Sequence, residues 1–396
     1  MQTYRDLFRN REFTALFTTA CVQNAASTVT GLALATAVYR STGSPLLTAL
    51  SMFGPSIAQL AGATLLLSAA DRLPPRAAIS SLALVTATLV AILSATPPTV
   101  AVFGVLLGMG LAGSVAGGVR GGLLTEIVPE RAYLLGRSAL NISTGTMQIA
   151  GFATGGLLVL VLSPGQTLLA GAGLHLLAAA VARLGLSRRA PRAAGRPSVA
   201  ETWRVNRRLW AIPGVRPIYL ALWIPNGLIV GCEALFVPWS PSGAGVLLAA
   251  AAAGMLAGDV LAGRYLTPRW RTRLAPWLRL LLAVPYLLFV LDPPLPIAAF
   301  AAAAASVGYC STLLLQEGLV AITPPQARGQ ALGLHTSGML TMQAVCAALA
   351  GTLAEHTAPG VAIAVMASAS IVVTLALAPA LRRRRMSSGH ATMAPA

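Results

Sequence analysis

The sequence predicts an all-α polytopic membrane protein with twelve transmembrane helices, arranged as two six-helix pseudo-symmetric bundles. Three observations lead to this fold class: a high apolar content, a one-sided distribution of basic residues, and a partial repeat between the halves of the chain. Of the 396 residues, 56% are apolar and 10% are charged, and the mean hydropathy is +0.74. A soluble domain of this length keeps a more polar exterior. The composition therefore indicates a chain that lies within a bilayer.

Each predicted span is an apolar stretch close to the length of about 20 residues that a helix needs to cross a bilayer. Glycine and proline interrupt several stretches, which membrane helices tolerate because neighbouring helices and water satisfy the freed backbone groups. Short links join the spans, except for one long link from Ser187 to Arg216. The predicted spans are 14–38, 46–70, 77–97, 99–127, 138–162, 165–187, 217–237, 243–263, 275–291, 296–322, 329–353 and 359–381.

The basic residues give these spans a direction. All 28 of them are arginine, and only Arg40 falls on the opposite side of the membrane from the rest. Arginine-rich links stay cytoplasmic because arginine resists transfer across the bilayer. We therefore expect both termini in the cytoplasm, which requires an even number of spans. Arginine without lysine, together with alanine-rich helices, indicates a high-GC genome and hence a bacterial inner membrane.

The net charge of +17 could suggest a nucleic-acid partner, but its distribution argues against one. The charge is spread over the ends of apolar segments, and no DNA- or RNA-binding motif accompanies it. Contact with anionic lipid headgroups at the inner face is the expected consequence. The sequence also displays no phosphate loop, nucleophile–base arrangement or metal-ligand spacing. We therefore expect neither a cofactor nor an enzymatic activity.

The two halves of the chain resemble each other. Thr146-Met147-Gln148 in the fifth span recurs as Thr341-Met342-Gln343 in the eleventh, an offset of 195 residues. The preceding helix ends match at an offset of 196, where Gly122-Leu123 corresponds to Gly318-Leu319. Parallel six-helix repeats place a substrate site at their interface near the midplane. The expected domains are a bundle at 1–187, a cytoplasmic linker with an amphipathic helix at 188–216, a second bundle at 217–381, and a disordered tail at 382–396.

Three motifs accompany the repeat. Leu67-Ser-Ala-Ala-Asp71-Arg72-Leu-Pro-Pro75-Arg76 joins the second and third spans, Gly258-Asp259-Val-Leu-Ala-Gly263-Arg264 ends the eighth, and Gly151-Phe152-Ala-Thr-Gly155-Gly156 lies in the fifth. Along essentially the whole chain, this pattern resembles the major facilitator superfamily. The first motif keeps the Asp-Arg pair and the last arginine of the family's loop signature but lacks two glycines and one arginine. In the third motif, Phe152 stands where the exporter branch has proline. The resemblance implies the fold of that family.

The stretches Phe8-Arg-Asn-Arg-Glu-Phe13 and Val38-Tyr39-Arg-Ser-Thr42-Gly43-Ser44 are similar to the exporter branch that includes enterobactin and macrolide efflux proteins. This resemblance implies a monomer that exports small amphipathic organic molecules in exchange for protons. Nutrient uptake by symport stays open, because the embedded acids do not separate the two directions. The alternative from a different class is a membrane receptor or enzyme. A receptor would carry a sizeable soluble domain and an enzyme a cluster of reactive residues at one face, and neither is visible.

Charged groups inside a membrane are costly and are therefore functional candidates. Glu233, in the outer third of the seventh span, and Glu317, near the inner end of the tenth, are the candidate proton carriers. Carboxyl groups in apolar surroundings can exchange protons near neutral pH. Arg120 lies close to the repeat-equivalent position of Glu317, so an ion pair between them across the halves could close an inner gate. The structural alternatives are a water-exposed charge at the outer mouth for Glu233 and headgroup contacts for the other two.

The loop motifs suggest further gate residues. Asp71, at the cytoplasmic end of the second span, is expected to face the start of the eleventh span near Gly329. A carboxylate at a helix N-terminus is favoured by roughly 0.3–1 kcal/mol. Ordinary loop charges are the alternative interpretation. The other gate candidates are Arg72, Arg76, Asp259 and Arg264.

Uncharged amides lie near mid-depth in the first, second, fifth, seventh and eleventh spans, which line the cavity in the family that the chain resembles. Such amides either bind a polar substrate or join helices through hydrogen bonds. The sequence leaves both possibilities open. A tryptophan in the seventh span could add a flat apolar wall. The substrate-cavity candidates are Gln23, Asn24, Gln59, Gln148, Trp223, Asn226 and Gln343.

Overall fold

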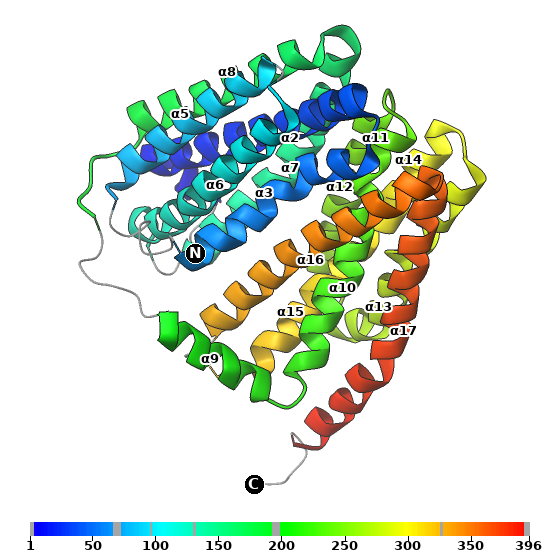
Figure 1. Cartoon of the computed structure of the whole chain (residues 1–396). Coiled ribbons are helices and arrows are strands. Elements are labelled where there is room, and N and C mark those ends of the chain that lie inside the picture. Colours follow the sequence, from blue (N-terminus) through cyan, green and yellow to red (C-terminus); the bar gives the residue numbers. More distant parts are fainter. Residues whose placement is uncertain are drawn as a thin grey trace. The chain divides into compact units, whose positions relative to one another are not determined.

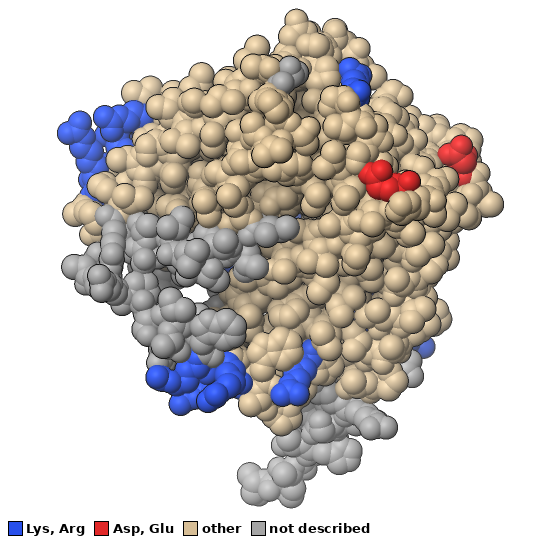
Figure 2. Space-filling view, viewed as in Figure 1, with Lys and Arg blue, Asp and Glu red and all other residues tan. Residues whose placement is uncertain are grey.

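The all-helical membrane fold is confirmed (Figure 1). Ten helices in the described part of the chain are long and apolar enough to cross a membrane, and they coincide with the third to twelfth predicted spans. The first two predicted spans fall on α2 (Arg11–Thr42) and α3 (Pro45–Leu65). Most of the face drawn in Figure 2 is neither basic nor acidic, as a surface in contact with lipid requires. The computed structural model describes residues 4–65, 73–95, 97–129, 132–191, 199–324 and 328–391.

The chain divides into two compact units, of which unit 1 comprises residues 1–197 and 236–253. Within it, α2 packs most extensively on α7 and α8, α5 on α8, and α3 on α6. Its buried core includes Phe13, Leu16, Ile79 and Leu123. The remaining helices of unit 1 are α1 (Tyr4–Arg9), α5 (Pro75–Ser94), α6 (Thr99–Ile127), α7 (Tyr133–Val161), α8 (Pro164–Gly185) and α11 (Phe236–Trp239).

Local sequence signals fix the ends of these helices. The Asn10 side chain accepts hydrogen bonds from the backbone N–H groups of Glu12 (2.9 Å) and Phe13 (3.2 Å) and so begins α2. Gly43 ends that helix with a left-handed backbone at φ 65°, which glycine adopts without a steric penalty. Ser163 and Gln166 form a reciprocal capping box at the start of α8.

Unit 2 comprises residues 198–235 and 254–396. In this unit α10 packs on α16 and α17, around a core that includes Ile218, Tyr219, Leu222 and Leu319. Two spans that the sequence predicts as single helices contain short 3-10 segments, η3 and η4. The elements are α9 (Val199–Ala211), α10 (Val215–Ala234), the second half of α12 (Ala244–Val260), the π-helical turn η2 (Leu261–Tyr265), α13 (Pro268–Leu281), η3 (Val284–Leu291), α14 (Leu295–Val307), η4 (Gly308–Cys310), α15 (Ser311–Ile322), α16 (Arg328–His356) and α17 (Pro359–Ala391).

Residues 236–253 belong to unit 1 by their contacts, although the sequence assigns them to the second bundle. Glycine allows this association. A Cβ atom on Gly245 would lie 3.0 Å from the Phe152 carbonyl oxygen and 3.2 Å from the Gly156 nitrogen, so α12 approaches α7 more closely than any other residue permits. The Tyr39 hydroxyl also donates a hydrogen bond to the Pro238 carbonyl at 3.4 Å. The predicted domain boundaries themselves stay a prediction.

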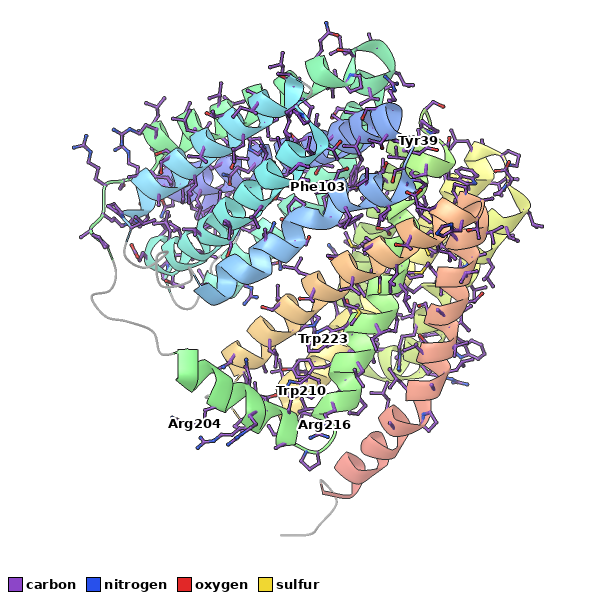
Figure 3. All side chains as sticks on the ribbon, in the orientation of Figure 1. Tyr39, Phe103, Arg204, Trp210, Arg216 and Trp223 are labelled. Atoms are coloured by element: carbon purple, nitrogen blue, oxygen red, sulfur yellow. The ribbon has the colours of Figure 1, made fainter. Side chains whose placement is uncertain are left out.

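The predicted amphipathic linker helix is present as α9, and one of its tryptophans packs on the protein. The ring of Trp210 lies 5.7 Å from that of Tyr219 and 5.9 Å from that of Trp223, both in α10 (Figure 3). Arg207 and Arg208 are exposed on the same helix. These ring contacts fasten α9 to the rest of unit 2.

Close packing of α12 on α14 depends on Gly254, because a Cβ atom there would overlap the carbonyl oxygen of Ala303. We expect Gly254→Ala to destabilise the protein by about 1–3 kcal/mol through overpacking, measured as a lower Tm in detergent. Gly104→Ala is the matched control, since nothing lies within 4 Å of that position and alanine favours a helix. Equal melting temperatures for the two variants would contradict the role assigned to Gly254.

Candidate functional site

Glu233 occupies the last turn of α10, where two tyrosines contact its carboxylate. The hydroxyls of Tyr286 and Tyr309 each donate a hydrogen bond to Oε1 over 3.4 Å. Both tyrosines are buried, with exposures of 0% and 8%. No ion pair to Glu233 forms among the residues that the structure describes. The carboxylate is therefore held by neutral donors in an apolar part of unit 2.

The two tyrosines sit on the irregular segments of the ninth and tenth spans. Tyr286 belongs to η3 and Tyr309 to η4. Non-helical backbone at membrane depth is tolerated only where protein buries it or where it lines a water-filled cavity. Sequence reasoning missed both residues, although each directly follows a helix breaker, Pro285 or Gly308. The Glu233 carboxyl group thus connects α10 to η3 and η4. A carboxyl group in this position can hold or release a single proton.

Glu317 has a partner within its own unit. Arg271 Nη1 lies 3.1 Å from Glu317 Oε1. The same guanidinium donates to the carbonyls of Leu266 (2.9 Å) and Gly263 (3.0 Å), where the eighth span ends. The side chain of Glu317 is 62% exposed, and such an exposed pair contributes no more than about 1 kcal/mol. Arg271 thus caps the backbone carbonyls at the end of the eighth span and pairs with a carboxylate of the tenth span.

Arg120 contacts an amide in this structure. Its Nη1 donates to Gln23 Oε1 over 3.4 Å, which connects α6 to α2 within unit 1. Gln59 lies beside the same glycine-rich helix, with its Nε2 3.5 Å from the position of a Cβ on Gly113. The described contacts of Arg120 and Glu317 are therefore made within separate units, and the ion pair between them stays a prediction.

Besides Gln23, three further predicted cavity amides form hydrogen bonds between helices. Asn24 Nδ2 donates to Thr144 Oγ1 at 3.0 Å, linking α2 to α7. Gln343 Nε2 donates to Asn226 Oδ1 at 2.9 Å, linking α16 to α10. These are corresponding helix pairs of the two predicted repeats, and Asn226 is only 5% exposed. The geometry favours helix joining for these three, whereas Gln148 forms no side-chain hydrogen bond among the described residues.

Trp223 fills a space left by a glycine. A Cβ atom on Gly338 of α16 would overlap the indole ring, and Trp223 Nε1 donates to the His335 carbonyl at 3.0 Å. Its ring stacks on Tyr219 at 4.9 Å. Trp223 thus joins α10 to α16. It is partly exposed, so its predicted role as a wall of the cavity stays a prediction.

His335 is a buried polar residue that sequence reasoning did not single out. It is 4% exposed, and its Nε2 lies 3.0 Å from Gln316 Nε2. Its Nδ1 is buried without a hydrogen-bond partner in the described part of the chain. Gln316 occupies the repeat-equivalent position of Arg120. That equivalence was the sequence signal that could have pointed to this pair of residues.

Of the remaining gate candidates, three lie in the described part of the chain. Asp71 and Arg72 lie outside the described residues. Arg76 is the second residue of α5, and its buried Nε has no hydrogen-bond partner among the described residues. Asp259 is partly buried in the last turn of α12, whereas the exposed Arg264 lies over the ring of Tyr265 at 6.0 Å. Their role at a gate stays a prediction.

A charge cluster that the sequence analysis overlooked joins three segments of unit 1. Glu12 accepts hydrogen bonds from Arg189 Nη1 (2.8 Å) and Nη2 (2.9 Å) and from the backbone N–H of Ser187 (3.0 Å). Arg189 Nε also lies 3.5 Å from Glu126 Oε2. A bidentate pair of this geometry is stronger than an ordinary surface pair. It ties the segment after α8 to the start of α2 and the end of α6.

Comparisons with known proteins place this geometry in a known architecture. No protein-family model matches the chain, and no curated protein matches it either. Among solved structures, a POT family transporter in complex with 5-aminolevulinic acid aligns with a TM-score of 0.75 at 11% identity, covering 94% of this chain and 96% of that chain. The fold is the major facilitator fold.

Two further structures align over nearly their full length. A bacterial homologue of the human lysosomal transporter Spinster, in an inward-facing and unoccupied conformation, has a TM-score of 0.69 at 16% identity, covering 95% of this chain and 93% of that chain. The nucleoside transporter NupG has a TM-score of 0.66 at 14% identity, covering 93% of this chain and 98% of that chain. At such identities the likeness extends to the fold alone.

The bond between Asn226 and Gln343 can be measured by a double-mutant cycle. We expect Asn226→Ala and Gln343→Ala to be non-additive in unfolding free energy by about 0.6 kcal/mol, and by no more than about 1.7 kcal/mol, as for other interhelical bonds in membranes. Asn24→Ala combined with Gln343→Ala is the control, because Asn24 bonds to Thr144 in unit 1. Additivity in both cycles would contradict a helix-joining role.

Proposed function

We propose that the chain is a secondary active transporter that exports small amphipathic organic molecules in exchange for protons. The fold supports transport, since the three similar structures above are all described as transporters. The observation that carries proton exchange is Glu233, a carboxyl group inside a span that has only hydroxyl partners among the described residues.

Protonation of Glu233 would change its hydrogen bonds to both neighbouring segments. As a carboxylate it accepts from Tyr286 and Tyr309 at one oxygen, whereas a protonated carboxyl is itself a donor. With the proton on Oε2, Oε1 can still accept both bonds, but as an uncharged oxygen it accepts more weakly, so each tyrosine hydroxyl is held less firmly. Ser306 is fully buried next to Tyr286, so its hydroxyl is an alternative partner for that tyrosine. Proton uptake at α10 would in this way alter contacts with η3 and α14.

Of the two carboxyl candidates, the contacts favour Glu233. Glu317 is largely exposed and already holds an ion pair with Arg271. Neutralising it would leave that guanidinium without its carboxylate. Glu233 has no cationic partner among the described residues, so it can exchange a proton without breaking an ion pair there.

Direction and setting follow from the sequence. The arginine distribution supports cytoplasmic termini in a bacterial inner membrane, and the resemblance to exporters supports efflux by a monomer. Transport would proceed by alternating access of the two bundles around a central site. Gln23, Gln59, Gln148 and Trp223 remain the proposed cavity residues.

The test uses inside-out vesicles that contain the full chain, an imposed proton gradient, and a panel of hydrophobic cations and antibiotics. We expect gradient-driven accumulation of at least one compound. Glu233→Gln should abolish it but leave substrate exchange without a gradient intact, because exchange needs no net proton movement. Glu317→Gln is the matched control and should retain accumulation.

Undiminished gradient-driven accumulation in Glu233→Gln would overturn the assignment of that carboxyl group. Loss in Glu317→Gln alone would transfer the coupling role to the tenth span. Accumulation only in right-side-out vesicles would make the chain an uptake symporter.

A further inference from the structure

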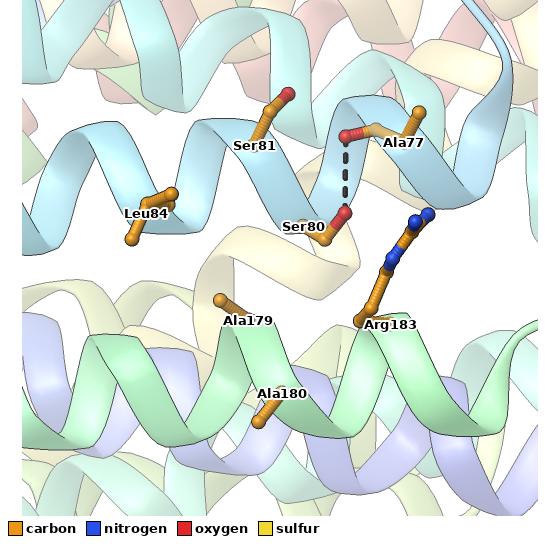
Figure 4. A pocket seen from close by; sticks show the side chains of 7 residues that line it. All are labelled: Ala77, Ser80, Ser81, Leu84, Ala179, Ala180 and Arg183. Carbon is orange, nitrogen blue, oxygen red and sulfur yellow. Dashed lines mark hydrogen bonds between the residues drawn. The ribbon is translucent and has the colours of Figure 1, made fainter.

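Unit 1 carries a groove of about 460 Å³ between α5 and α8 (Figure 4). This volume falls within the range of about 300–1,000 Å³ that is typical of small-molecule sites. Small side chains leave the space open, among them Ser80 on α5 and Ala180 on α8. Leu84 and Arg183 also line the groove.

The polarity of the groove changes along its length. Arg183 lies in the last turn of α8, and Ser80 is close to the start of α5. Leu84 lies one helical turn further into its span than Ser80. One end of the groove is therefore polar and lies near the membrane surface on the side of the arginine-rich links. The other end is apolar and lies deeper.

The surroundings of the groove are apolar. Beside it, Leu176, Leu177 and Leu184 of α8 are 49%, 50% and 84% exposed. Both helices are long and apolar enough to cross a membrane, so these side chains face hydrocarbon. A molecule that enters the groove therefore comes from the bilayer.

The polar end favours an anion. Arg183 is exposed and forms no ion pair or hydrogen bond with any residue that the structure describes. Its guanidinium extends across the groove towards Ala77 in the first turn of α5 (Figure 4). The N-terminus of α5 adds a partial positive charge. The Ser80 hydroxyl already donates to the Arg76 carbonyl at 2.8 Å, so Arg183 and the helix end provide the attraction.

We propose that this groove binds one anionic phospholipid from the leaflet that meets the arginine-rich links, with its phosphate at Arg183 and an acyl chain along Leu84 and Ala180. The combination of a cationic rim and an apolar floor matches the two ends of such a lipid. Guanidinium and phosphate form charge-assisted hydrogen bonds. This site lies within unit 1 and does not depend on the proposed transport activity.

Native mass spectrometry of the full chain, with phosphatidylglycerol titrated against phosphatidylcholine, tests the charged end. We expect Arg183→Gln to weaken phosphatidylglycerol binding about fivefold, which corresponds to about 1 kcal/mol. Arg188→Gln removes an exposed arginine that does not line the groove and should leave binding unchanged. Equal losses in the two variants would overturn the role of Arg183.

The apolar end is tested by filling it. Ala180→Trp should displace the acyl chain and remove the bound lipid whatever its headgroup. Leu157→Trp places the same ring on an exposed position of α7 (64% exposed), which does not line the groove, and should retain the lipid. Retention by both variants would overturn the site. If Ala180→Trp does not fold, as judged by its Tm, Ala180→Leu replaces it and should weaken binding relative to Leu157→Trp.

Discussion

Every backbone N–H and C=O group inside a bilayer needs a partner within the protein, and this requirement determines where the helices of this chain can break. At the end of the eighth span, Arg271 donates to the carbonyls of Gly263 and Leu266. In the ninth and tenth spans, the backbone changes to 3-10 geometry without leaving the helical hydrogen-bond pattern. Side chains from different helices meet at these irregular segments. Glu233 is hydrogen-bonded to a tyrosine in each of two of them, η3 and η4.

The same requirement explains the use of glycine and amide residues between helices. Gly245 and Gly254 let α12 touch the backbones of α7 and α14, so helix contacts are made by main chain rather than by bulky side chains. Polar side chains can also meet between helices, as Asn226 meets Gln343. Polar groups joined in this way have little capacity left to bind a substrate. The amides that remain unbonded are therefore the more informative ones for ligand recognition.

Apolar length was sufficient to predict the spans from sequence, because it is a property of single segments. Partner choice was not predictable, because it depends on how each helix is rotated about its axis. Repeat equivalence suggested that Glu317 pairs with Arg120. In the structure, Glu317 forms an ion pair with Arg271 of a neighbouring helix. Similarly, Tyr286 and Tyr309 are apolar-looking residues in apolar stretches, and only the fold brings their hydroxyls to Glu233. The resemblance to known motifs indicated the architecture but not these contacts.

The exclusive use of arginine has a consequence for cellular control. Across these 396 residues no side chain carries a primary amine, since all 28 basic residues are arginine. Acetylation and ubiquitin-type conjugation target lysine, and neither finds an acceptor side chain here. Arginine also stays charged at every physiological pH. Control of abundance or activity by lysine chemistry is therefore closed to this stretch of chain, and the charge of its arginines does not vary with physiological pH.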